Sequence, residues 1–274
     1  MRGAPTKSNM TTVAMRAISC AALFVAGLAA ATPFSTLAVE CTASSGPLRV
    51  AVLELYTSEG CDSCPPADRW VSELPARKLT ADRVIALAFH VDYWNDLGWI
   101  DPFSQSQFSA RQRQQSRRRG ASFVYTPQLL LNGQDYRRAV LFDDFESKVK
   151  TFNQLKPQAQ IRLRLTGSAD ALDSQVDVNA ENARQLRAEV YLALFENNLA
   201  TAVKAGENKG RMLTHDFVVR EFVGPLALDD KGRLSYTHHF ALDASWKPHD
   251  LHLAAFVQDP RSGEVLQALA PVCR

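Results

Sequence analysis

The sequence predicts an exported protein with two domains, an α/β domain followed by an all-β domain. Three observations support this. The chain opens with a basic and then apolar segment. Strand-like and helix-like segments alternate up to about residue 157, which is typical of a layered α/β domain. Short segments of alternating polarity follow to the end. We therefore expect a signal peptide over 1–38, an α/β domain over 39–157 and a β-sandwich over 158–274.

The first 38 residues have the order of a secretory signal peptide. Arg2, Lys7 and Arg16 precede or begin the segment, no acidic residue occurs in it, and residues 17–28 are small or apolar. The apolar run is shorter than the roughly 20 residues that span a bilayer. We expect cleavage after Ala38 rather than an uncleaved anchor. The mature protein would be periplasmic or secreted, without stable membrane insertion.

The charge of the mature chain argues against nucleic acid as a partner. The full chain has 31 basic and 29 acidic side chains. Three of the basic ones lie in the signal segment, so the remainder has a net charge of −1. Nucleic-acid-binding domains usually carry a clearly basic surface.

The elements of the first domain follow from apolar patterning. Buried strands are expected at 48–56, 84–91 and 128–133, because these runs are short and rich in β-branched or apolar residues. Helices are expected at 67–78, 103–119 and 142–155. The second helix carries a group of arginines that we interpret as a solvated face, favourable near a helix C-terminus, or as a site for an anionic partner: Arg111, Arg113, Arg117, Arg118 and Arg119.

The cysteines suggest two disulfides. Cys20 would leave with the signal peptide, and the remaining four allow three pairings. Disulfides persist in oxidising compartments. We pair the neighbours Cys61 and Cys64, and we pair Cys41 with Cys273, which would join the two ends of the mature chain as a structural disulfide. The alternative for the second pair is two unrelated thiols.

Cys61 and Cys64 form a Cys-x-x-Cys sequence where a strand ends and a helix begins. The N-terminus of a helix has unpaired N–H groups and a positive partial charge, and both stabilise a thiolate. The thiolate is the nucleophile of disulfide exchange. Cys64 lies one helical turn further, close enough to resolve a mixed disulfide. This pattern predicts a redox site.

Three segments resemble a family of secreted bacterial proteins of unknown function in the thioredoxin-like superfamily. They are residues 54–68 (ELYTSEGCDSCPPAD), 91–103 (VDYWNDLGWIDPF) and 125–128 (YTPQ). The resemblance implies a thioredoxin-like fold for the first domain. It also implies a cis bond before Pro127 and a role for the Thr126 backbone in holding an extended substrate. Asp62 and Ser63 replace the Gly-Pro of thioredoxin itself.

Two further positions in this domain have alternative interpretations. Glu54 lies among apolar residues of a buried strand, where its pKa would rise and it could relay protons. The alternative for Glu54 is a structural hydrogen-bonding role. His90 and Trp94 follow the second strand. They would wall a substrate groove or belong to a packed aromatic loop, with His90 as a core histidine.

The second half reads as about seven short strands in about 115 residues, which suggests an immunoglobulin-like sandwich. Turn sequences such as residues 207–210 separate the strands. By fold analogy we expect a recognition role for this domain. Its histidines lack the spacing of a closed ligand set, so we expect no metal there: His215, His238, His239, His249 and His252.

These observations favour an exported thiol–disulfide oxidoreductase. Cys61 would attack and Cys64 resolve, with Pro127 and Thr126 positioning a protein or a small thiol or disulfide. No cofactor is needed beyond the dithiol. One alternative is a binding module in which the Cys61–Cys64 disulfide is only structural. Another is a peroxidase-like thiol enzyme with Thr57 as an activating residue. The redox hypothesis requires that a partner can reach Cys61.

Overall fold

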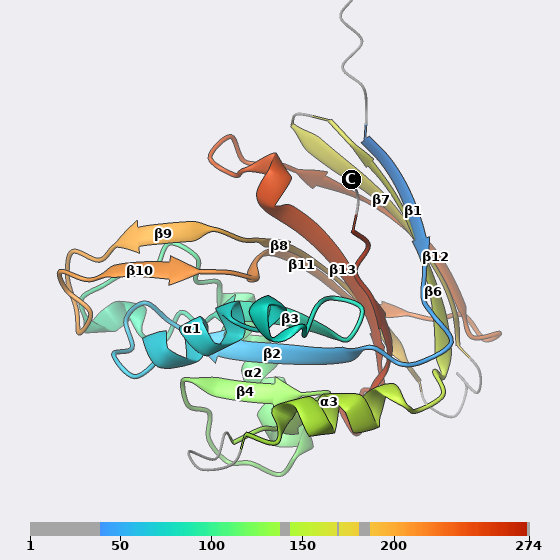
Figure 1. The fold of residues 1–274 in the computed structure, drawn as a ribbon, viewed down its shortest axis with the longest axis horizontal. Helices are drawn as coiled ribbons and strands as arrows, with labels where there is room; N and C mark the ends of the chain where they lie inside the picture. The colour runs from blue at the N-terminus through green and yellow to red at the C-terminus, as the bar shows by residue number, and fades with distance from the viewer. Residues whose placement is uncertain (1–38, 138–142, 169, 181–186, 273–274) are drawn as a thin grey trace, which may run out of the picture. The chain divides into compact units, whose positions relative to one another are not determined.

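The computed structural model describes residues 39–137, 143–168, 170–180 and 187–272, which belong to one compact unit (Figure 1). The signal peptide expected over 1–38 lies outside the described residues. The helices are α1 (Pro65–Ser72), α2 (Ser106–Arg118) and α3 (Phe145–Asn153). The strands are β1 (Val39–Ser44), β2 (Ala51–Thr57), β3 (Val84–His90), β4 (Gln128–Leu131), β5 (Gln134–Asp135), β6 (Ala159–Gly167), β7 (Ala171–Ala180), β8 (Glu189–Glu196), β9 (Leu199–Ala202), β10 (Met212–His215), β11 (Val218–Ala227), β12 (Arg233–Ala241), β13 (Leu251–Gln258) and β14 (Val265–Leu269).

The longest sheet among the described strands has eight members, in the order β14-β13-β8-β11-β3-β2-β4-β5. β2 pairs parallel with β3 and antiparallel with β4. β3 pairs parallel with β11, where Ala88 faces Val218, and the Ala88 N–H donates to the Phe217 carbonyl at 2.8 Å. This one sheet therefore combines strands from both sides of residue 157.

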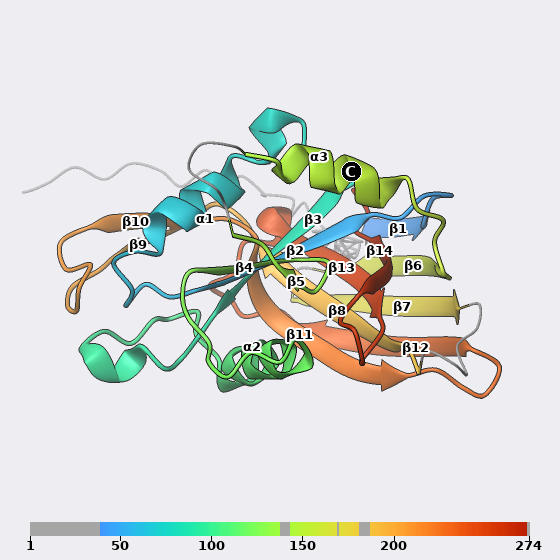
Figure 2. The same ribbon diagram turned by 90° about the horizontal axis from the view of Figure 1, so that it is seen from below.

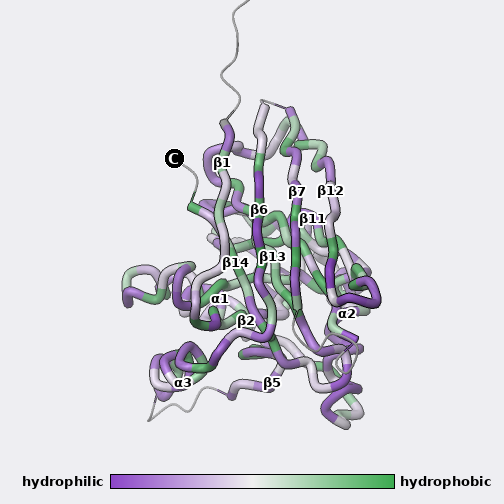
Figure 3. The backbone as a smooth tube through the Cα atoms, turned by 90° about the vertical axis from the view of Figure 1, so that its right-hand side faces the viewer, coloured by the Kyte–Doolittle hydropathy of each residue, from purple (hydrophilic) through white to green (hydrophobic). Residues whose placement is uncertain are grey.

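A second sheet has the order β1-β6-β7-β12, and Figure 3 shows its strands side by side. β1 comes from the start of the described chain and pairs antiparallel with β6. A third sheet consists of β9 and β10. The first strand of the chain therefore belongs with strands that the sequence assigned to the second domain.

The predicted combination of a thioredoxin-like α/β domain and an immunoglobulin-like sandwich is wrong. The described chain is mostly β-sheet, with three short α-helices and a mixed eight-stranded sheet that joins both halves. The physical reason is that alternating polarity indicates which face of a strand is buried, but not which strand lies beside it. Most helices and strands lie close to their predicted ranges, but the pairing of the strands could not be predicted from this pattern.

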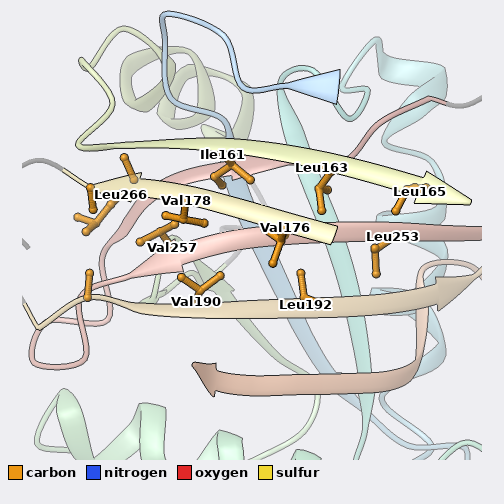
Figure 4. Close-up of a cluster of buried hydrophobic side chains, with 14 of the residues drawn as sticks. Ile161, Leu163, Leu165, Val176, Val178, Val190, Leu192, Leu253, Val257 and Leu266 are labelled. Carbon is orange, nitrogen blue, oxygen red and sulfur yellow. The ribbon is translucent and has the colours of Figure 1, made fainter. Parts of the chain in front are cut away.

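The core between the two large sheets is mainly aliphatic. Side chains of β6 and β7 point at side chains of β8, β13 and β14, and Figure 4 shows these two layers facing each other. Every second residue of β6 is buried, as the sequence pattern requires of a strand with one face in a core. The residues that meet include Ile161, Leu163, Val176, Leu192, Leu253 and Val257.

The remaining surfaces of the long sheet are covered by helices. Leu53 and Leu55 of β2 pack with Trp70 and Val71 of α1 and with α3. Val52 and Tyr56, on the opposite face of β2, belong to a separate cluster that contains Phe108 of α2. Figure 2 shows α1 and α3 on one side of β2 and α2 on the other. The face of β2 on which a side chain lies thus decides whether it is near α1 and the cysteines.

Candidate functional site

Cys61 and Cys64 form a disulfide, which confirms the predicted pairing; their Cα atoms are 5.4 Å apart. Cys61 follows a turn after β2, in which its N–H donates to the Ser58 carbonyl at 3.2 Å. Cys64 is the N-cap residue of α1, and Pro65 and Pro66 occupy the first two helical positions. Proline suits these positions because their N–H groups would have no helical partner. The sequence places the pair correctly at a strand-to-helix junction.

The start of α1 differs from the expected thiolate site in its hydrogen bonds. The two prolines have no N–H to donate. The N–H groups of Ala67 and Asp68 both donate to the Cys64 carbonyl, at 2.9 and 3.1 Å. The Sγ of Cys61 instead lies 3.4 Å from the Oγ of Ser63. Within the described residues, the Ser63 hydroxyl is the donor positioned to stabilise a thiolate at Cys61.

Pro127 and Thr126 lie beside this junction. The Thr126–Pro127 bond is cis, as the family resemblance implied. Pro127 and Ser63 line the same cavity of about 480 Å³, whose walls include the aromatic side chains of Trp70 and Tyr125. Thr126 accepts a hydrogen bond from the Nε1 of Trp94 at 2.8 Å, which anchors the Trp94 ring in this region. The structure thus brings the Cys-x-x-Cys segment and Pro127 together around one cavity.

Glu54 lies on the other face of β2, away from α1. Its carboxylate accepts two hydrogen bonds from Arg111, both at 2.8 Å, and one from the Tyr56 hydroxyl at 2.6 Å. The pKa of Arg111 is raised: burial alone would lower it, but the negative charge of Glu54, its hydrogen bonds and the nearby Tyr56 and Tyr191 together outweigh burial. The geometry supports the structural role for Glu54 rather than proton relay. It also corrects the interpretation of Arg111, which is buried and not part of a solvated face.

A carboxyl group that the sequence analysis did not single out lies on the same helix as Cys64. Asp68 is four residues beyond Cys64, a spacing that puts two side chains on one helix face, and it is only 6% exposed. The Oγ of Thr57 donates to Asp68 at 3.2 Å. Burial raises the pKa of Asp68 more than the nearby His215 and His90 lower it. The helical spacing was visible in the sequence, but the burial of Asp68 was not.

Two histidine–carboxylate pairs lie next to this carboxyl group. The Nδ1 of His90 is 2.7 Å from Asp101, and the Nε2 of His215 is 3.1 Å from Glu59. The two imidazole rings are 5.0 Å apart. The His90 Nε2 and the His215 Nδ1 have no hydrogen-bond partner within the described part of the chain. The core-histidine interpretation of His90 fits this position.

The His90–Asp101 pair predicts a pH dependence of stability. Burial alone would lower the pKa of His90, but the charge and hydrogen bond of Asp101 raise it above the usual value. The imidazolium therefore stabilises the fold below the unfolded pKa of about 6.5. That contribution is lost as the pH rises through the folded pKa. Asp68, whose pKa is also raised, acts with the same sign. The lowered pKa of Asp101 acts with the opposite sign, but only at acidic pH.

Urea unfolding of the wild type and of His90→Gln, measured at several pH values, tests this. We expect the wild-type free energy of unfolding to fall as the pH rises above about 6.5, and the dependence to be weaker in the variant. The exposed His249→Gln is the matched control and should keep the wild-type slope. Equal slopes for wild type and His90→Gln would contradict the assignment.

Cys61 is covered in this structure. Both cysteines have a relative exposure of 0%. The loop between β9 and β10 holds the backbone of this turn: the buried Asn208 donates to the carbonyls of Glu59 and Cys61 at 2.8 and 2.9 Å. In this conformation a partner cannot reach the sulfur of Cys61. The sequence marked this segment as a turn, and nothing in it signalled contact with the cysteines.

Several other residues from the sequence analysis are located as follows. Thr57 is buried, and its hydroxyl donates a hydrogen bond to Asp68. Cys273 lies outside the described residues, so its pairing with Cys41 stays a prediction. Within the described ranges, no group of three or more His, Cys, Asp or Glu side chains is arranged to hold a metal ion. The described helices include none with the length and apolar character needed to cross a membrane.

The fold and the site define a mostly β protein with a covered Cys-x-x-Cys disulfide at the start of a short helix. The chain belongs to the family described as "Protein of unknown function (DUF1223)", whose model matches residues 52–258. This confirms the resemblance to a family of unknown function. No curated protein matches the chain.

Two solved structures are similar to this chain. Protein AGR_C_4864 from Agrobacterium tumefaciens is 25% identical, with a TM-score of 0.58; the match covers 82% of this chain and 96% of that one. HBP35 of Porphyromonas gingivalis is 16% identical, with a TM-score of 0.63, covering 83% and 76%. The second similarity concerns the fold alone.

Proposed function

We propose that the protein is an exported thiol–disulfide oxidoreductase that uses Cys61 and Cys64. The observation that carries the proposal is the disulfide between these residues at the start of α1, beside a cavity shared by Ser63 and Pro127. The Ser63 hydroxyl, 3.4 Å from the Cys61 Sγ, is placed to stabilise a thiolate there. The aromatic walls of the cavity offer a partner an apolar contact surface next to the disulfide.

The exchange starts from the disulfide. A thiolate of the partner attacks the Sγ of Cys61, the Cys61–Cys64 bond breaks, and its electron pair leaves with Cys64 as a thiolate. A second thiolate of the partner then attacks the partner's own sulfur in the mixed disulfide and releases Cys61. The partner loses two electrons and two protons, and the two cysteines gain them. The same steps in reverse reduce a partner's disulfide.

Residues around the disulfide have separate tasks in this scheme. The Ser63 hydroxyl donates to the Cys61 thiolate. Asp68 gives a proton to the released Cys64 thiolate and takes one back in the reverse direction, which a raised pKa favours. Thr126 and Pro127 hold the partner's backbone. The partner is a protein or a small thiol or disulfide, the compartment is periplasmic or extracellular, and the dithiol needs no cofactor.

The burial of both cysteines favours one alternative, a binding module with a structural disulfide. Structural disulfides have reduction potentials below about −300 mV, whereas catalytic ones are more oxidising. A peroxidase-like enzyme is less well supported, because the bond to Cys64 leaves Cys61 without the lone thiolate that such chemistry needs.

A trapping experiment tests the proposal. Cys64→Ser leaves Cys61 without its resolving partner, so mixed disulfides should accumulate when the full chain is expressed for export. We expect adducts that dithiothreitol releases, and at least a several-fold lower yield from the Cys61→Ser/Cys64→Ser double variant. The double variant controls for adducts at Cys41 or Cys273. Absence of adducts at Cys61, together with a potential below about −300 mV, would establish the structural alternative.

A further inference from the structure

We infer that the β9–β10 hairpin, residues 199–215, is a lid over Cys61 and that the side chain of Asn208 is its latch. The purpose of the lid rests on the proposed function, because a lid over the sulfur matters only where a partner must reach it. The quantity that the inference predicts is the accessibility of the Cys61–Cys64 disulfide to a reductant. That property is measurable whether or not the protein catalyses exchange.

Asn208 holds the backbone of the cysteine turn with its whole side chain. The two N–H bonds of its amide donate to the carbonyls of Glu59 and Cys61. Its Oδ1 accepts from Arg211 at 2.8 Å, which fixes the orientation of the amide. Asn208 is 0% exposed. A buried amide with three satisfied hydrogen bonds is a specific attachment, because breaking any of them inside the protein costs free energy.

Other contacts of the hairpin surround the same turn. The Glu207 carboxylate accepts from the Asp62 N–H at 3.1 Å, immediately after Cys61. His215, at the end of β10, lies 3.1 Å from the Glu59 carboxylate, two residues before Cys61. Gly206 packs against Trp99, and the Trp99 Nε1 donates to Glu59 at 2.8 Å. The hairpin therefore contacts the chain on both sides of Cys61.

The hairpin is built as a separate unit. In the described chain, β9 and β10 pair with each other and form a two-stranded sheet outside the two larger ones. Figure 1 shows the pair extending beyond the larger sheets on the side of α1. A two-stranded hairpin has little stability of its own, so its contacts with the rest of the protein hold it in place. Loss of the Asn208 contacts should therefore let it lift without unfolding the sheets.

Lifting the hairpin would expose the Cys61 sulfur, which a partner must reach for disulfide exchange. The Cys61 carbonyl would lose its Asn208 donor and keep the Cys64 N–H, at 3.3 Å, at the same moment as the Cys61 sulfur loses its cover. A partner that supplies a backbone N–H to that carbonyl would replace the latch while its thiolate attacks. The lid thus slows the reaction of the disulfide with any thiol until the hairpin is displaced.

The test measures how fast dithiothreitol reduces the Cys61–Cys64 bond in the full folded chain. Alkylation and mass spectrometry of the peptide that contains both cysteines separate this bond from any other. We expect Asn208→Ala to be reduced about ten- to thirty-fold faster than wild type, because two hydrogen bonds no longer oppose opening. Lys209→Ala, at the exposed next position of the same loop, is the matched control and should react at the wild-type rate. Equal rates for wild type, Asn208→Ala and Lys209→Ala would overturn the latch.

Hydrogen exchange of the wild type keeps the inference testable if Asn208→Ala fails to fold. Amides of Thr201 and Leu213 should exchange faster than those of β8 and β13, through local opening. Exchange of all of them at the rate of global unfolding would overturn the lid. The experiments can refute the lid and the proposed function independently of each other. Adducts at Cys61 with no effect of Asn208→Ala would refute the lid alone, and faster reduction without adducts would refute the oxidoreductase alone.

Discussion

Arg111→Ala is expected to lower the free energy of unfolding by about 3–5 kcal/mol. The substitution leaves the Glu54 carboxylate buried, 1% exposed, without its cation. The Arg111 guanidinium also lies over the rings of Tyr191 and Phe222, 4.7 and 4.9 Å from their centroids. Alanine removes both the ion pair and this packing. Urea denaturation of the purified variant measures the change.

Two further variants isolate the cause of this loss. Arg117→Ala removes an arginine from the exposed face of the same helix, so its effect should be within about 0.5 kcal/mol. The double variant Glu54→Leu/Arg111→Met replaces the pair with apolar side chains of similar size and should recover most of the stability. A loss below about 1 kcal/mol for Arg111→Ala would mean that water reaches Glu54 and that the buried pair is not as described.

Gly133→Ala is expected to destabilise the fold by about 2–4 kcal/mol, through a clash and a strained backbone together. Gly133 lies in the turn between β4 and β5 with a φ of +77°, and a Cβ there would be 2.0 Å from the Gly263 carbonyl oxygen. That carbonyl accepts from Gln258 at 2.6 Å, so it cannot move without loss. The turn and the β13–β14 connection therefore need glycine at this position.

Gly120→Ala separates the two contributions. Gly120 has a similar φ of +71°, but a Cβ there would meet no atom within 4 Å. It should cost about 1 kcal/mol, which is the backbone strain alone. Thermal or urea unfolding of both variants gives the difference. Equal losses would show that the backbone at Gly133 shifts to relieve the clash.

The sequence predicted local features well where short-range rules apply. The strand at 84–91 and the helix at 103–119 appear as β3 and α2 within a few residues. The Cys61–Cys64 bond follows from adjacency, and the cis bond before Pro127 came from the family resemblance. Each of these depends on residues that are neighbours in the chain.

The long-range features could not be predicted from patterning. The pairing of Ala88 with Val218 joins the halves of the sheet, and either strand pattern would fit another neighbour equally well. Arg111 looked solvated because the buried face of α2 is largely polar. Apart from Phe108, the buried side chains of that face are polar, which hydrophobic periodicity does not detect: Ser109, Arg111, Gln112, Gln115 and Ser116.

The candidate site shows the same limit. Cys61, Cys64 and Pro127 could be named from the sequence. Asn208 could not, because it is 147 residues from Cys61 and belongs to an ordinary turn sequence. The two alternatives for Glu54 could not be separated from the sequence, because its ion pair with Arg111 joins residues 57 positions apart.

The cover of the disulfide has a consequence for the order of events during synthesis on the ribosome. Glu207 and Asn208 leave the ribosome 145 or more residues after Asp62 and Cys61. A nascent chain that has emerged only as far as β8 would carry both cysteines with no residue of the hairpin to shield them. Oxidants thus have a window in which to join the two sulfurs, and that window closes when the last third of the protein folds.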